Sequence, residues 1–138
     1  MEITTCTTQH LIKSEDLNHH GTLYAGRSAE WLVESGFIAA ANLTSPENIV
    51  CLKIHGMVFK RPVKRGEILR YDSKIVLAGR TRLVAFIEAS VKGQHVVSGF
   101  ITFIHVDMDG KPLPHGVELV AVTPQDQELQ AQAAALPD

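Results

Sequence analysis

The chain has 138 residues and a formal net charge of −2, and 45% of its residues are hydrophobic. This length suits one domain with its own core, and the small net charge argues against general nucleic-acid binding. The two cysteines are too few for a disulfide framework, and no secretory leader or membrane span is expected, so we expect a cytoplasmic protein.

The N-terminal third of the chain contains the stretch around which the rest is organised. Residues 2–12 are rich in Thr and β-branched residues and predict a first strand. Residues 17–41 then begin with the polar turn Asn18–Gly21 and continue into an apolar segment too long for a strand. Its apolar residues recur at helical spacing, which predicts a buried central helix. The start of such a helix offers free backbone N–H groups to an anion or a polarised carbonyl.

Four strands are predicted after this helix, at residues 49–59, 68–77, 81–90 and 95–107. Gly56 indicates a bulge or a close backbone approach in the first of them. Alternation in the second places five side chains on one face: Leu69, Tyr71, Ser73, Ile75 and Leu77. Short turns join the last three strands into a meander. The order of elements predicts an α+β fold, with an antiparallel sheet curled around one long helix.

The C-terminal residues 123–138 are expected to form a helical tail outside the main domain of residues 1–122. Thr123 is a good helix cap, and Pro124 suits the first helical position. A long strand at the edge of a curled sheet needs a cover, which predicts at least a homodimer.

Positive charge is concentrated in the middle of the chain. Between Lys53 and Lys92, ten Lys or Arg residues stand against three acids, a local balance of +7. Two interpretations remain open: solvated strand faces, or a cationic patch for the phosphates of a small molecule.

Four blocks of sequence occur in an order that is similar to a known family. They are NHHGTLYAG at 18–26 with WLVE at 31–34, FKRPVKRGE at 59–67, GRT at 79–81 and FITFIHVDMDGKP at 100–112. Together they resemble the acyl-CoA thioesterases of the hotdog fold. The resemblance implies that residues 1–122 form a hotdog domain that hydrolyses an acyl-CoA thioester to a free acid and CoA. It also implies a homo-oligomer with sites between protomers, no metal, and no cofactor beyond the CoA of the substrate.

The same resemblance implies roles for individual residues. Asn18 would position water or substrate, and the N–H groups of Ala25 and Gly26 would bind the thioester oxygen. The family's catalytic carboxylate falls on Val33 in this chain, which makes Glu34, one residue later, the candidate base or nucleophile. Further candidates would contact the substrate, the basic ones through the CoA phosphates: His20, Tyr24, Arg61, Lys64, Arg65, Arg80 and Thr81.

Several alternatives stay open at this point. Glu34 lies in an apolar helix, where burial would suit a proton-transfer role. The alternative is an acid at the edge of the helix that pairs with Arg27 or with a partner chain. Glu30 is another possible base. Loss of the carboxylate at Val33 suggests a non-hydrolytic acyl-CoA binder or sensor. A hydratase is a third hypothesis, although Asp16 and His20 fall one residue short of the spacing in hotdog hydratases. The pair His19–His20 is more simply explained as polar loop residues than as a metal site.

Overall fold

The computed structural model describes residues 1–137. The strands in this range form one antiparallel sheet. Its strand order is β1-β4-β5-β6-β2, and β3 also pairs with β6. The strands are β1 (Cys6–Leu11), β2 (Ile49–Ile54), β3 (Val58–Phe59), β4 (Ile68–Ala78), β5 (Arg82–Val91) and β6 (Gln94–His105). The helices are α1 (Ala25–Ala41) and α2 (Pro124–Ala134), with short 3-10 turns at Ser14–Asp16 and Pro46–Asn48. The predicted meander of β4, β5 and β6 is confirmed.

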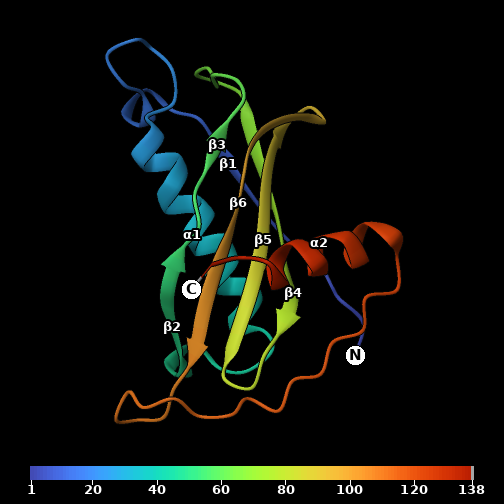
Figure 1. Ribbon diagram of the computed structural model, residues 1–138. Coiled ribbons are helices and arrows are strands. Elements are labelled where there is room, and N and C mark those ends of the chain that lie inside the picture. The colour runs from blue at the N-terminus through green and yellow to red at the C-terminus, as the bar shows by residue number, and fades with distance from the viewer. Residues whose placement is uncertain (138) are drawn as a thin grey trace.

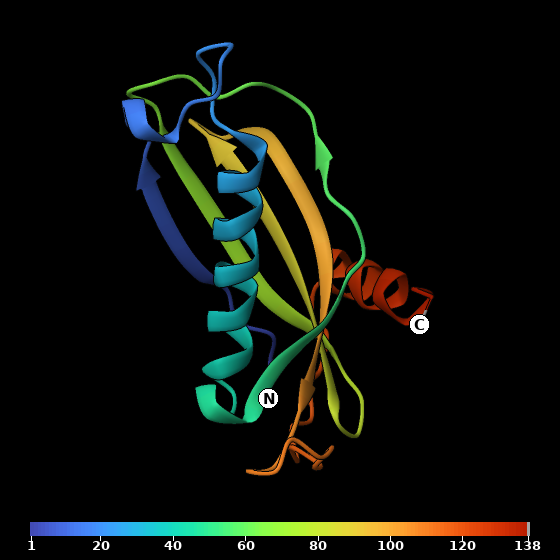
Figure 2. The same cartoon turned by 90° about the vertical axis from the view of Figure 1, so that its left-hand side faces the viewer.

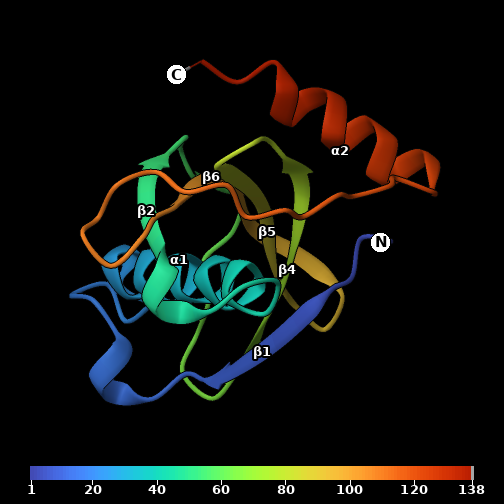
Figure 3. The ribbon, with the colours of Figure 1, turned by 90° about the horizontal axis from the view of Figure 1, so that it is seen from below.

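The sheet curves around α1, which lies along its inner face (Figures 2 and 3). The alternating residues of β5 that were expected to face the core, Leu83, Ala85, Ile87 and Ala89, are all fully buried. At Gly36 an added β-carbon would lie 3.0 Å from the Ile87 side chain, so a glycine lets α1 approach β5 closely. This arrangement confirms the predicted α+β fold with a curled sheet and a central helix.

Two buried hydroxyl groups fix the position of α1 on the sheet. The Tyr71 hydroxyl on β4 donates to the carbonyl oxygen of Ser28 at 3.0 Å and also contacts the Ser28 hydroxyl. Further along, the Ser73 hydroxyl donates to the Ser35 carbonyl oxygen at 2.8 Å. Because these side chains are buried, their hydrogen bonds are needed to offset the loss of contact with water.

The edge strand is interrupted at Gly56, as the sequence predicts. β2 ends at Ile54 and β3 begins at Val58, with Gly56 at a φ of +121° between them. The carbonyl of Gly56 lies so close to Gly99 of β6 that a β-carbon at position 99 would collide with it. Along this edge five large apolar side chains are about half exposed: Val50, Leu52, Ile54, Val58 and Phe59.

The outer face of the sheet is partly covered by α2 (Figures 1 and 2). Leu129 and Ala133 of α2 pack on Val76 and Val84, and Lys74 of β4 forms a 2.5 Å ion pair with Asp126. Thr123 caps the helix by accepting a hydrogen bond from the Asp126 amide, as expected. No helix in residues 1–137 is both long and apolar enough to cross a membrane.

One side chain lies on the opposite face from the one predicted. A register shift between Ile75 and Leu77 interrupts the alternation of β4, so Leu77 packs with Val76 and Val84 on the outer face. Such a bulge adds a residue on one strand and reverses the facing of the side chains beyond it.

Candidate active site

The loop before α1 is shaped by the side chain of Asn18. Its Oδ1 atom accepts hydrogen bonds from the backbone amides of His20 at 2.9 Å and Thr22 at 3.3 Å. Within residues 1–137 no acceptor contacts its Nδ2 amide. Asn18 therefore holds the turn with one end of its amide group and keeps two N–H donors for another molecule.

Asp16, which the sequence analysis did not single out as a catalytic candidate, attaches this loop to the helix. Its side chain is buried, accepts from the Lys13 amide at 2.9 Å, and lies 3.6 Å from Nε of Arg27. Its carbonyl oxygen accepts from the Tyr24 amide at 2.9 Å. Arg27 is thus paired with Asp16 and not with Glu34, which was one of the alternatives left open by the sequence.

The first turn of α1 exposes backbone donors, as the sequence predicts. Tyr24 occupies the N-cap position without a side-chain cap, and its carbonyl oxygen accepts from the amides of Arg27 and Ser28. The N–H groups of Ala25 and Gly26 precede these and have no intrahelical acceptor. Both residues are exposed, and their N–H groups have no acceptor within residues 1–137, which suits binding of a carbonyl oxygen.

The Tyr24 ring lies over this helix start. A β-carbon on Gly26 would collide with the ring, and Tyr24 itself is 58% exposed. Gly26 therefore leaves room for an aromatic side chain beside the exposed N–H groups. This position suits the predicted contact of Tyr24 with a substrate. His20 lies nearby in the loop, is exposed, and packs against the ring of His19.

Glu34 is exposed, which corrects the expectation that it would be buried in the helix. Its charge acts on His10 of β1, whose ring stacks on Trp31 with centroids 4.1 Å apart. Burial lowers the pKa of His10, while the negative charges of Glu34 and Asp16 oppose that shift. Glu34 thus lies on the β1 side of α1, whereas Val33 is half-buried against the core.

The predicted phosphate-binding residues fall into two groups at opposite ends of the sheet (Figure 2). Arg61, Lys64 and Arg65 lie in the loop between β3 and β4, which pairs with the Asn18 loop through the Thr22–Lys64 bridge. Arg80 and Thr81 lie in the hairpin between β4 and β5, beyond the C-terminal end of α1. One protomer does not bring the two groups together. Within residues 1–137, no three His, Cys, Asp or Glu residues cluster in a way that could hold a metal ion.

The curled sheet, the enclosed helix and the open N–H groups at its start define a hotdog domain. The family model of the Thioesterase superfamily matches residues 20–98, and the chain belongs to that family. This confirms the resemblance inferred from the four sequence blocks.

Two curated relatives are similar in sequence. The acyl-CoA thioester hydrolase YciA of Salmonella typhimurium is 31% identical over 115 residues, which cover 75% of this chain and 84% of the relative. The uncharacterized acyl-CoA thioester hydrolase YkhA of Bacillus subtilis is 24% identical over 121 residues. That match covers 82% of this chain and 66% of YkhA, so the chain spans slightly less than two thirds of YkhA.

Solved structures share the fold. The acyl-CoA hydrolase of Staphylococcus aureus, solved with butyryl coenzyme A and coenzyme A, superposes with a TM-score of 0.84 at 20% identity, covering 94% of this chain and 82% of the other. A hexameric acyl-CoA thioesterase superposes with a TM-score of 0.85 at 21% identity, covering 95% and 86%. The hexameric thioesterase y2039 of Yersinia pestis gives 0.74 at 22% identity, covering 80% and 94%.

Proposed function

We propose that the chain hydrolyses acyl-CoA thioesters to a free acid and CoA. Membership of the Thioesterase superfamily and relatives named acyl-CoA thioester hydrolases support this substrate class. The observation that carries the proposal is the uncapped start of α1, where Ala25 and Gly26 are exposed, preceded by a loop in which the Nδ2 amide of Asn18 has no partner within residues 1–137.

In the proposed reaction, these N–H groups bind the thioester oxygen and Asn18 orients a water molecule. Glu34 removes a proton from that water as the water oxygen attacks the carbonyl carbon of the thioester. The N–H groups stabilise the negative charge that develops on the thioester oxygen. Collapse of this intermediate re-forms the carbonyl and breaks the C–S bond, and the CoA thiolate leaves with the proton that Glu34 removed from the water. Each oxyanion donor is worth roughly 2.7–4 kcal/mol in comparable enzymes.

The distance along α1 supports a site built from two protomers. Gly26 and Glu34 are eight residues apart, which is about 12 Å along a helix axis. A thioester held at Gly26 is therefore out of reach of Glu34 on the same helix. In the proposed site, Glu34 acts on a substrate bound at another protomer's helix start.

The open edge of β2 and β3 supports self-association. Its half-exposed apolar side chains suit antiparallel pairing with a second copy, which extends the sheet. Such pairing turns one protomer end for end, so the Arg80 hairpin moves toward the Arg61 loop of the other copy. A CoA bound across this junction would meet both basic groups. We also propose a cytoplasmic location, which the sequence suggested.

A non-hydrolytic acyl-CoA binder is the second candidate, and the position of Glu34 favours it. Glu34 lies on the β1 side of α1, away from the open β2 edge, and Val33 has no ionisable group. A chain of this kind would bind CoA esters at the helix start without breaking them.

The proposed role of Asn18 is tested by the Asn18→Asp variant. Aspartate keeps the oxygen that accepts from His20 and Thr22 but loses the N–H donors. We expect an unchanged melting temperature and at least a tenfold loss of thiol release from acyl-CoA. His19→Asn, in the same loop, serves as the control and should retain activity. Wild-type turnover in Asn18→Asp would remove the Asn18 amide from the mechanism.

A further inference from the structure

The turn that joins β5 to β6 lies at the same end of the sheet as the start of α1 (Figures 1 and 2). It consists of two residues, Lys92–Gly93. The loop between β3 and β4 is attached to this hairpin by two hydrogen bonds. The Lys60 amide donates to the Val96 carbonyl oxygen at 2.7 Å, and the Arg61 guanidinium donates to the side-chain oxygen of Gln94. The basic loop and the hairpin are therefore held side by side.

A hollow of about 370 Å³ lies between the loop and the hairpin. Its lining includes three cationic side chains, Arg61, Lys64 and Lys92, against one acid, Glu67, a formal balance of +2. We call it the hairpin hollow. The Glu67 carboxylate accepts from the Lys64 amide at 2.7 Å, so it is already engaged within its own loop. The volume falls within the roughly 300–1,000 Å³ of small-molecule sites.

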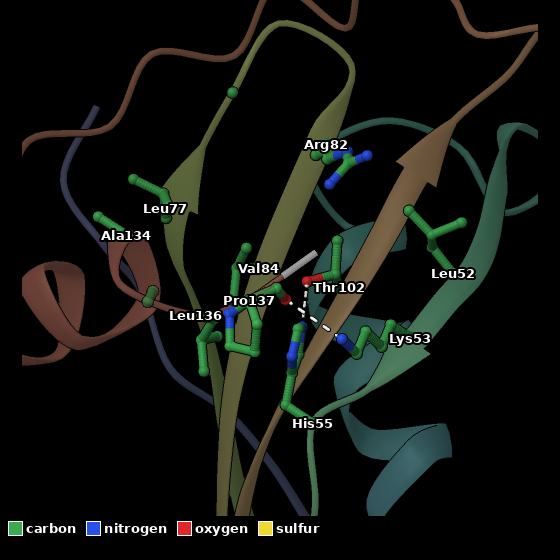
Figure 4. A pocket seen from close by; sticks show the side chains of 12 residues that line it. Leu52, Lys53, His55, Leu77, Arg82, Val84, Thr102, Ala134, Leu136 and Pro137 are labelled. Atoms are coloured by element: carbon green, nitrogen blue, oxygen red, sulfur yellow. Dashed lines mark hydrogen bonds between the residues drawn. The ribbon is translucent and has the colours of Figure 1, made fainter.

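The cationic groups of the hairpin hollow are available to an anion. Within residues 1–137, the ammonium groups of Lys64 and Lys92 form no hydrogen bond or ion pair, and both residues are exposed. Arg61 uses one guanidinium N–H in its bond to the hairpin and keeps the others. Lys53 on the outer face differs, because its ammonium group donates to the carbonyl oxygen of Pro137 at 3.3 Å (Figure 4).

Lys92 has a backbone conformation that does not suit a lysine. Its φ is +49°, and within residues 1–137 no other residue except glycine has a positive φ. Two-residue hairpin turns usually carry Asn, Asp or Gly at this position, because these residues tolerate a positive φ. Turn geometry therefore does not account for a lysine here. Its ammonium group is what the usual turn residues would lack.

We propose that Lys92 completes a subsite, with Lys64 and Arg61, for the 3′-phosphate of CoA. This inference rests on the proposed function, because it names a part of the same substrate. A phosphate monoester carries a charge of about −1.5 to −2 and three acceptor oxygens, which suits three cationic side chains with a balance of +2. The CoA pyrophosphate is a diester with less charge on each phosphate and suits this cluster less well. Lys92 lies outside the four sequence blocks, so the resemblance did not imply this contact.

Calorimetric titration of the full chain with CoA and with dephospho-CoA, which lacks the 3′-phosphate, tests the subsite. The wild type should bind CoA at least tenfold more tightly than dephospho-CoA. Lys92→Asn suits the turn, so it should keep the wild-type melting temperature or raise it, while removing most of this preference; Lys92→Arg should retain the preference. Lys111→Asn, an exposed lysine beyond the C-terminal end of β6, is the matched control and should bind both ligands as the wild type does. Equal wild-type affinity for the two ligands, or a preference that survives Lys92→Asn, would overturn the proposal.

Kinetics separate the subsite from the proposed hydrolysis. Lys92→Asn should raise the KM for an acyl-CoA at least tenfold with little change in kcat. It should hydrolyse the acyl-pantetheine thioester, which has no phosphate, as the wild type does. Preferential CoA binding that depends on Lys92, without any thiol release, would refute only the proposed hydrolysis. Thiol release with the same KM in the wild type and Lys92→Asn would refute only the Lys92 subsite.

Discussion

Tyr71 shows how a single buried hydroxyl links stability to pH. Burial raises the pKa of Tyr71 to about 12 from its ordinary 10.0, and the hydroxyl bonds to Ser28 of α1. The unfolded chain ionises this group near pH 10 while the folded chain keeps its proton. The stability that the neutral hydroxyl contributes is therefore complete below pH 10 and is lost as the pH rises toward 12.

The Tyr71→Phe variant tests this link. We expect the free energy of unfolding to fall by about 1–2 kcal/mol at pH 8, because the Ser28 hydroxyl loses its partner in the core. Between pH 9 and 11 the variant should lose less stability than the wild type in urea titrations. Tyr24→Phe, whose ring is exposed, should follow the wild-type pH profile. A Tyr71→Phe profile parallel to that of the wild type would show that the hydroxyl is not buried.

At the scale of elements, the break between β2 and β3 depends on two glycines in contact. Gly56 has a φ of +121° and presents its carbonyl to Gly99 on β6. The break separates two short strands along an edge that would otherwise be one longer strand. It therefore sets the shape of the surface on which a second copy would pair.

The Gly99→Ala variant should disturb this break. The added β-carbon would collide with the Gly56 backbone, which cannot move without shifting the edge strand. We expect a loss of about 1–3 kcal/mol in urea unfolding. Gly79→Ala is the comparison, because its β-carbon would lie 3.8 Å from the Arg82 carbonyl oxygen, an ordinary contact. Equal stability of the two variants would contradict the close approach.

Much of the fold could be predicted from the sequence because strand and helix periods are local. Alternation placed the β5 residues toward the core, and Gly56 indicated the break in the edge. The bulge after Ile75 could not be predicted from alternation, because both faces of β4 there are apolar and buried. Asp16 joins the loop to α1 through its side chain, at Lys13 and Arg27, and through its carbonyl oxygen, at Tyr24. These contacts exist only in the folded loop, so no periodic pattern in the sequence could indicate them.

For the whole molecule, self-association along β2 is the main expectation. Ile54→Lys places a charge on the apolar edge, and we expect sedimentation velocity to show dissociation toward monomers. Ile68→Lys is the matched control, since Ile68 is similarly exposed at 54% but β4 lies inside the sheet. An oligomer that survives Ile54→Lys unchanged would show that copies assemble through another surface.

The central claim of hydrolysis is tested most directly by thiol release from acyl-CoA esters of increasing chain length, measured together with calorimetric binding of the same esters. Glu34→Gln is compared with Glu30→Gln, which changes an exposed glutamate one turn earlier on α1. We predict wild-type turnover, a loss of at least a hundredfold in Glu34→Gln, and near wild-type activity in Glu30→Gln. Saturable binding of CoA esters with no thiol release from the wild type would contradict hydrolysis and would leave an acyl-CoA binder.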